Sequence, residues 1–278
     1  MRFGIALRTM GTAATGGILQ ACAARAESAG LDTLWIPDHI AIPPDDAEGS
    51  GGRYLDPLAT LAWLAARTSR IRLGTAVLIL PYRPALPTAK AIATIQELSG
   101  ERLELGVGVG WMEAEFRAVG RSRGERGRLC DEVLGFLHGA FDAPDDVAVS
   151  NGQPFLFRPN PKKPRIWIGG AAPQALVRAA RFGDGWLPMN DDPEKLVAPI
   201  AELAARFAAA GRPPPEVAVF GGLGRRADDE ELDRLARLEA IGVTEFIQGA
   251  RYEDTAGFER ALEPLVARRD AHRARSAR

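Results

Sequence analysis

Residues 102–111 read RLELGVGVGW, a pattern typical of a short apolar strand followed by an aromatic residue. Gly106, Gly108 and Gly110 alternate along it and therefore lie on one face of the strand. Glycine is unfavourable in strands, because it offers no side chain to pack and loses the most backbone entropy on folding. Two interpretations stay open: a flat ligand approaches the bare backbone beside Trp111, or neighbouring residues fill the space in a barrel strand with small inward residues.

On both sides of this stretch, short strand-like runs alternate with longer helical patterns. Gly30 is a good C-terminal cap for the first helix, and Asp56 with Pro57 forms a typical start for the second. The predicted strands are residues 3–7, 33–37, 71–80, 103–109, 165–168, 185–188, 216–220 and 244–248. The helices that follow them are predicted at about 18–29, from 57, and at 86–98, 126–141, 173–182, 193–210, 228–241 and 255–269.

Eight strand–helix units in 278 residues predict an α/β fold, a (β/α)8 TIM barrel. A doubly wound open sheet fits less well, since no change in composition marks a second domain. We predict a single domain over residues 1–278, with a hairpin insertion at 143–164 after the fourth unit. Pro199 and Pro264 fall inside predicted helices, where each should kink or restart the helix.

Composition excludes several classes of protein. A formal net charge of −1 leaves no electrostatic footprint for nucleic acid, and the basic end at 268–278 is predicted to be a frayed, solvated terminus. No apolar run approaches the roughly 18 residues of a membrane span, and the start does not resemble a signal peptide, so we expect a cytoplasmic protein. Cys22 and Cys130 are expected to be buried, unpaired residues.

In a barrel of this kind, the chemistry belongs at the carboxyl ends of the strands. His39 is the only one of three histidines at such a position, where it could exchange a proton near neutrality or merely hydrogen-bond a loop. Asp38 could orient His39, cap the next segment or accept a hydrogen bond from a ligand ring. The other predicted strand-end residues are Arg8, Thr9, residues 78–82, Gly110, Trp111, Gly169, Gly170, Met189, Asn190, Gly221, Gly222, Gly249 and Arg251.

The residues that several classes of enzyme need for catalysis are absent from these positions. None of the four lysines is at a strand end for Schiff-base chemistry, and three scattered histidines do not predict a metal site. No GxSxG motif is present, and GVGVG lacks the third glycine of a dinucleotide fingerprint. We infer that a bound cofactor carries the chemistry. The turn after Gly169 and Gly170 either offers a phosphate site at a helix start near Ala172 or simply needs glycine for a positive φ.

Four segments in order carry a resemblance to a known family: LWIPDHI (34–40), RIRLGTAVLILPYRPA with IATIQELSGERLELGVGVGW (within 70–111), PRIWIGGAAPQAL (164–176) and GDGWLPM (183–189). With them the chain resembles the bacterial luciferase-like superfamily, in particular the branch that uses the deazaflavin coenzyme F420. The resemblance covers nearly the whole chain. It implies a flavin-type ring at the carboxyl end of the barrel and commonly a homodimer.

The resemblance also implies roles for individual residues. Asp38 and His39 match an Asp-His pair near the deazaflavin ring, with His39 as an acid–base group and Asp38 orienting it. Residues 75–77 match a segment that holds a non-proline cis peptide behind the ring, and residues 169–172 match a turn that contacts phosphate. The predicted cofactor-binding residues are Asp38, Thr75, Ala76, Val77, Gly108, Gly110, Trp111, Gly169, Gly170, Ala171 and Ala172.

Our leading hypothesis is an F420-dependent oxidoreductase that acts on a small organic substrate over Trp111, Leu80 and Tyr82. The F420-dependent sugar-phosphate dehydrogenases carry a glutamate where Trp111 stands and lysines for the sugar phosphate, which argues against that activity here. The alternatives are an FMN-dependent monooxygenase supplied by a partner reductase and a catalytically silent cofactor-binding paralogue. The loop at 43–53 could be a mobile lid or disordered.

Overall fold

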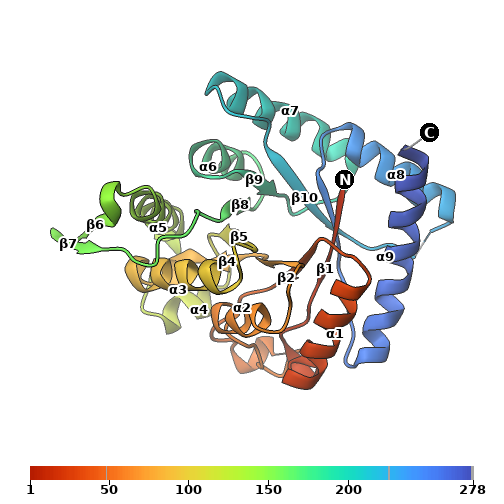
Figure 1. The fold of residues 1–278 in the computed structure, drawn as a ribbon, viewed down its shortest axis with the longest axis horizontal. Coiled ribbons are helices and arrows are strands. Elements are labelled where there is room, and N and C mark those ends of the chain that lie inside the picture. Colours follow the sequence, from red (N-terminus) through yellow and green to blue (C-terminus); the bar gives the residue numbers. More distant parts are fainter. Residues whose placement is uncertain (48, 225, 277–278) are drawn as a thin grey trace.

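Eight parallel strands close into a barrel in the computed structural model, which describes residues 1–47, 49–224 and 226–276 (Figure 1). Each strand pairs in parallel with the next, and the last pairs with the first. The predicted TIM barrel is confirmed. The ring consists of β1 (Arg2–Ala6), β2 (Thr33–Ile36), β3 (Arg72–Thr75), β5 (Leu103–Gly108), β8 (Arg165–Gly169), β9 (Gly185–Leu187), β10 (Glu216–Gly221) and β11 (Glu245–Gln248).

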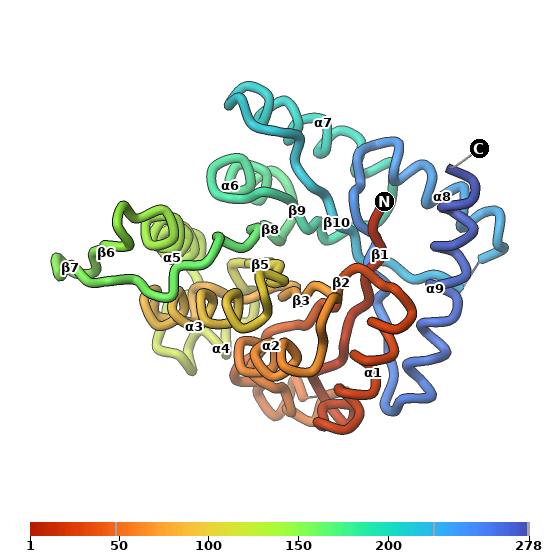
Figure 2. Tube along the Cα trace, in the orientation of Figure 1, coloured from red at the N-terminus to blue at the C-terminus, as the bar shows by residue number. Residues whose placement is uncertain are grey.

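The helices lie outside the strands and cover the barrel (Figure 2). The side chains of Thr15, Asp56 and Asp192 accept backbone N–H groups at the starts of the first, second and seventh helices, as capping residues do. Neither Pro199 nor Pro264 restarts its helix. The helices are α1 (Gly16–Ser28), α2 (Pro57–Ala65), α3 (Ala85–Leu98), α4 (Glu113–Ala118), α5 (Arg126–Phe141), α6 (Gln174–Phe182), α7 (Pro193–Ala209), α8 (Asp228–Ala240) and α9 (Thr255–Ser276).

The predicted third strand, residues 71–80, is interrupted. β3 ends at Thr75, the Ala76–Val77 peptide bond is cis, and β4 (Leu78–Ile79) pairs again with β5. A single 3-10 turn, Leu80–Tyr82, then leads to α3. The cis peptide implied by the family resemblance is therefore present, and it forms a bulge in the barrel wall.

Polar and aromatic side chains fill the amino-terminal part of the barrel interior. The carboxylates of Glu104 and Glu245 are fully buried and accept the indole N–H groups of Trp167 and Trp35, each at 2.8 Å. Arg2 forms ion pairs with both carboxylates. The two indoles pack edge to face with their centroids 5.8 Å apart. This packing closes the amino-terminal end, so any cavity in the barrel opens at the carboxyl end.

A two-stranded hairpin projects beside α5, between the fourth strand–helix unit and β8 (Figure 1). β6 (Val147–Ser150) and β7 (Gln153–Leu156) pair antiparallel around Asn151 and Gly152. Both turn residues have positive φ, 48° and 77°, as two-residue hairpin turns require. That this segment is an insertion into the barrel stays a prediction.

The carboxyl-terminal segment differs from the expectation of a frayed end. α9 continues to Ser276, because its arginines bind neighbouring elements. Arg268 pairs with Asp228, and Arg269 donates to the carbonyl of Ala29 at 2.6 Å. Cys22 and Cys130 are buried and unpaired as predicted. No helix within the described ranges is long and apolar enough to cross a bilayer.

Candidate active site

His39 follows β2 at the carboxyl end of the barrel, and its ring is held by Glu115 of α4. The His39 Nδ1 atom lies 2.9 Å from Glu115 Oε2, while Oε1 accepts the backbone N–H groups of Ile40 at 2.6 Å and Ala41 at 3.1 Å. The hydroxyl of Tyr82 donates to Oε2 at 3.1 Å. Glu115 thus receives four hydrogen bonds, which is about the capacity of a carboxylate.

The charge of Glu115 fixes the hydrogen-bonding state of the histidine. Burial would raise the pKa of Glu115, but the hydrogen bond from His39 and those from the backbone outweigh burial and lower its pKa to about 2. The carboxylate is therefore ionised at neutral pH and can only accept. His39 Nδ1 must donate to it, so the neutral ring carries its lone pair on Nε2. Nε2 is thus the ring nitrogen that the protein leaves without a partner, and the side chain of His39 is 18% exposed.

Asp38 does not orient His39, in contrast to the sequence-based expectation. Its carboxylate is paired with Arg83, with Nη1 to Oδ2 at 2.5 Å and Nη2 to Oδ1 at 2.9 Å, and Oδ2 also accepts the N–H of Ile79 at 2.8 Å. Burial raises the pKa of Asp38, and the guanidinium and the N–H oppose that rise. Asp38 ties the end of β2 to the segment after β4, and the residue that orients His39 is Glu115.

The bulge at residues 75–77 explains the glycines of β5. A Cβ atom on Gly106 would lie 1.9 Å from the carbonyl oxygen of Thr75, and one on Gly108 would lie 2.4 Å from Val77 Cγ2. A Cβ on Gly169, at the end of β8, would lie 2.5 Å from Val77 Cγ1. Of the two interpretations of the glycine stretch, the structure supports the second, in which neighbouring residues fill the space that the glycines leave. Gly108 and Gly169 are therefore not a bare surface for a ligand, because Val77 covers them.

The turn after β8 needs glycine for a positive φ, and its phosphate-binding role stays a prediction. Gly170 has φ 125°, which favours glycine, and its carbonyl accepts the indole N–H of Trp186 at 2.9 Å. Ala171 and Ala172 are exposed, and α6 starts just after them with no side-chain cap at Pro173. Backbone N–H groups at this start are therefore accessible to an anion.

Gly110 and Trp111 lie at the end of β5. Gly110 has φ 75°, and a Cβ there would lie 2.8 Å from Ile79 Cγ2, so the position requires glycine for its own packing. Trp111 is 65% exposed, and its ring lies edge-on to His39 with the centroids 6.3 Å apart. Trp111 and His39 are thus neighbours at the rim.

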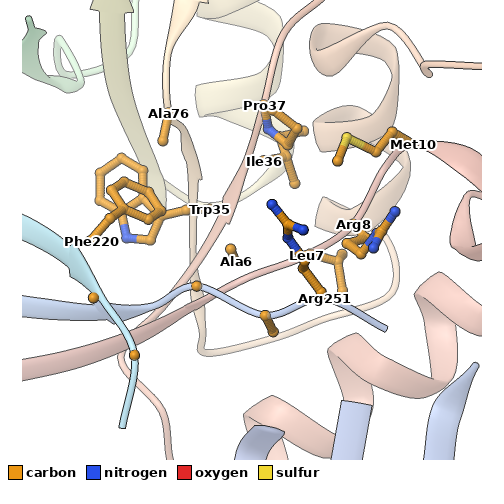
Figure 3. A pocket seen from close by; sticks show the side chains of 14 residues that line it. Ala6, Leu7, Arg8, Met10, Trp35, Ile36, Pro37, Ala76, Phe220 and Arg251 are labelled. Atoms are coloured by element: carbon orange, nitrogen blue, oxygen red, sulfur yellow. The ribbon is translucent and has the colours of Figure 1, made fainter. Parts of the chain in front are cut away.

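A cavity of about 440 Å³ opens at the same end of the barrel (Figure 3). Its wall comes from the ends of β1, β2, β10 and β11 and from the bulge after β3. Of the predicted cofactor-binding residues, Ala76 is the one among its lining residues. The wall includes Trp35, Phe220, Met10, Arg8 and Arg251.

Sequence reasoning missed Glu115, Arg83 and the arginine pair of the cavity as functional neighbours. Glu115 and Arg83 lie 76 and 45 positions from their partners in the chain, so no local motif joins them. Arg8 and Arg251 appeared among the strand-end residues, but nothing in the sequence indicated that they share one cavity. The available signal was the rule that functional residues lie at the carboxyl ends of barrel strands. This rule selects single positions and does not say which of them are in contact.

A closed parallel barrel with a cavity at its carboxyl end and a histidine held there by a buried glutamate defines the chain as a TIM-barrel enzyme. The chain belongs to the luciferase-like monooxygenase family, whose model matches residues 1–278. It is therefore a luciferase-like oxidoreductase.

Among its relatives is an uncharacterized protein of Mycobacterium tuberculosis that is 33% identical over 272 residues, covering 90% of this chain and 92% of the relative. A 5,10-methylenetetrahydromethanopterin reductase of Methanolobus tindarius is 32% identical over 199 residues, 70% of this chain and 56% of the relative. An FMNH(2)-dependent dimethylsulfone monooxygenase of Pseudomonas fluorescens is 31% identical over 155 residues, 52% of this chain and 42% of the relative.

Two solved structures share the fold. The monooxygenase RslO1 from Streptomyces bottropensis superposes with a TM-score of 0.78 at 21% identity, covering 98% of this chain and 99% of that one. An F420-dependent secondary alcohol dehydrogenase in complex with an F420-acetone adduct gives a TM-score of 0.77 at 15% identity, covering 96% and 98%. The fold therefore occurs with both deazaflavin-dependent and oxygen-using chemistry.

Proposed function

We propose that this protein is an F420-dependent oxidoreductase acting on a small organic substrate. The observation that carries the proposal is the His39–Glu115 pair at the rim: one oriented proton acceptor, with no second histidine there in the described part of the chain. Such a site moves a proton and leaves the electrons to a cofactor. The methanopterin reductase relative also matches a larger share of this chain than the FMNH(2)-dependent relative does.

The residues present fit a flavin-type group. The cavity is within the size range of small-molecule sites, is largely apolar and is lined by Ala76 of the bulge. The exposed start of α6, with the N–H groups of Ala171 and Ala172, would hold a phosphate of the cofactor tail. When bound, the deazaflavin supplies a hydride acceptor or donor at its central ring. His39 takes or returns the accompanying proton at Nε2, and Glu115 keeps the ring in the required tautomer.

Cofactor binding is the direct test. The purified protein is titrated separately with F420 and with FMN, and the quenching of ligand fluorescence is followed. We expect micromolar or tighter binding to F420 and at least tenfold weaker binding to FMN. Equal or preferred FMN binding would refute the choice of cofactor.

The FMNH(2)-dependent relative supports a second candidate, a flavin monooxygenase that receives reduced FMN from a partner reductase. Oxygen consumption distinguishes the two, because a reduced deazaflavin reacts sluggishly with oxygen. Rapid oxygen uptake with reduced FMN, and none with reduced F420, would establish the monooxygenase.

Two further predictions accompany the proposal. If neither cofactor binds, the alternative that remains is a catalytically silent paralogue. Replacement of His39 by Ala also tests its role, since unchanged turnover of any substrate found would remove the residue from the mechanism. A homodimer and a cytoplasmic location stay predictions, and sedimentation of the purified protein checks the first.

A further inference from the structure

The cavity at the carboxyl end of the barrel has an aromatic side and a basic side. Figure 3 shows the rings of Trp35 and Phe220 together, and the guanidinium groups of Arg8 and Arg251 set apart from them toward Met10. Trp35 has no exposed surface and lies behind the cavity wall, held by Glu245 and packed on Trp167, while Phe220 is partly exposed. A ligand in this cavity therefore meets the ring of Phe220, backed by the fixed indole of Trp35, and two cations.

Neither arginine is neutralised within the described residues. Arg8 has one side-chain contact, a long hydrogen bond of 3.4 Å from Nη2 to the carbonyl oxygen of Gly49, and its Nε is buried without a partner. Arg251 has no hydrogen-bond or ion-pair partner among them. Most other arginines near the strand ends are paired: Arg83 binds Asp38, and Arg234 binds Asp191, the carboxylate beside Gly221 of the cavity wall.

Both arginines line one partly enclosed cavity, Arg8 half-buried with its Nε lacking an acceptor and Arg251 exposed, so the cavity carries two positive charges that no described carboxylate offsets. An anion placed between them would satisfy both conditions. Arginine binds carboxylate and phosphate oxygens with paired N–H groups, and it stays charged at any working pH. The aromatic side would at the same time receive a flat, apolar body.

We propose that this cavity binds an organic anion with a flat apolar body, whose carboxylate or phosphate lies against Arg8 and Arg251. As the substrate of the reaction, this anion would share the cavity with the cofactor ring and rests on the proposed function; as a ligand of the cofactor-free cavity, it stands independently. The anionic group fixes the orientation of the ligand, and the uncharged part lies over Phe220.

Three probes of similar shape test the site: 2-naphthoate, 2-naphthyl phosphate and the neutral 2-naphthamide. Each is titrated calorimetrically into the cofactor-free protein at low salt. We expect at least one anion to bind tenfold or more tightly than the amide, and its affinity to fall as salt is added. The tighter of the two anions identifies the anionic group. Equal affinities for the amide and both anions would overturn the proposal.

Two variants assign the effect to the cavity. Arg251→Gln removes an exposed cation that has no hydrogen bond or ion pair with the described residues, so the fold should be unaffected while anion affinity falls at least tenfold. Arg237→Gln removes an exposed arginine of α8 outside the cavity and should leave the affinity unchanged. An unchanged affinity in Arg251→Gln, or an equal loss in Arg237→Gln, would contradict the site.

The same protein separates this proposal from the proposed function. Naphthoate binding that disappears in Arg251→Gln supports the anion site even if neither F420 nor FMN binds. Binding of F420 without any preference for the anions over the amide supports the cofactor and refutes the anion site.

Discussion

At the scale of single residues, Glu115 sets the tautomer of His39. In Glu115→Gln the amide oxygen can still accept the N–H groups of Ile40 and Ala41, and the amide nitrogen then faces His39 Nδ1. Since that nitrogen donates, the ring must accept at Nδ1 and carry its proton on Nε2. We expect the imidazole nitrogen shifts in NMR to report this change, and turnover to fall about 10²-fold or more with KM little changed.

Glu113 provides the matched control, because it lies on the same helix but is exposed and pairs with Arg123. Glu113→Gln should leave both the tautomer and turnover as in the unmodified protein. A His39 ring that keeps its proton on Nδ1 in Glu115→Gln would contradict the orienting role of Glu115.

A substitution at Asp38 tests the other buried charge at the rim, the ion pair between Asp38 and Arg83. Asp38→Asn leaves the Arg83 guanidinium, which is itself largely buried, without its main counter-charge. Breaking a buried pair in this way costs about 3–5 kcal/mol of the free energy of unfolding. Asp56 also contacts Arg83, at 3.3 Å, but is half exposed, so Asp56→Asn should cost about 1 kcal/mol or less. Urea unfolding measures both; equal losses would show that the Asp38 pair is not a buried anchor.

At the scale of elements, the bulge between β3 and β4 and the glycines of β5 act as one unit. In Gly108→Ala the new methyl group would meet Val77 Cγ2 at 2.4 Å. Overpacking of this kind costs about 1–3 kcal/mol of the free energy of unfolding. The double variant Gly108→Ala with Val77→Ala should recover part of the loss, because the two side chains compete for one space.

Gly135 in α5 gives the opposite expectation, since a Cβ there meets nothing within 4 Å. Gly135→Ala should raise the free energy of unfolding by up to about 1 kcal/mol. Denaturant midpoints for Gly108→Ala, Val77→Ala, their double variant and Gly135→Ala decide the matter. Strictly additive effects at positions 77 and 108 would mean that the bulge and the glycines are independent.

The elements also show what the sequence can predict. Periodicity, caps and turn residues are local, so the eight strand–helix units were recognisable and the closed barrel followed from their number. The cis peptide at Ala76–Val77 was expected from the family resemblance alone. The partners of His39 and Asp38 were assigned wrongly, because the adjacent Asp-His dipeptide suggested a contact that the fold replaces with Glu115 and Arg83.

At the scale of the whole molecule, the barrel separates a closed amino-terminal interior from an open carboxyl-terminal cavity. The sequence-based rule for barrels placed the chemistry at the correct end. It did not foresee the buried carboxylates at the other end, since Glu104 and Glu245 lie in strands that otherwise read as apolar. Burying these carboxylates lowers the stability of the fold, but their hydrogen bonds hold the indoles in place. One of these indoles, that of Trp35, is held by Glu245 and lies at the cavity.

The pH dependence of the free energy of unfolding measures the effect of burying Glu245. Burial raises the pKa of Glu245 to about 7, and the charge of Arg2 and the hydrogen bond from Trp35 oppose the rise without cancelling it. Between pH 4.5 and about 7 the folded carboxyl keeps its proton while the unfolded one loses it. The free energy of unfolding must therefore fall as pH rises through that window, by about 3 kcal/mol from this group.

Glu245→Gln has no proton to lose, so relative to the unmodified protein it should gain stability between pH 4.5 and pH 8, in urea unfolding at both values. Glu202→Gln, an exposed change on α7, should track the unmodified protein at both. A Glu245→Gln curve parallel to that of the unmodified protein would show that the carboxyl stays ionised throughout. Arg2 would then fully compensate its burial, and the indole of Trp35 would be held by a charge-assisted hydrogen bond at neutral pH.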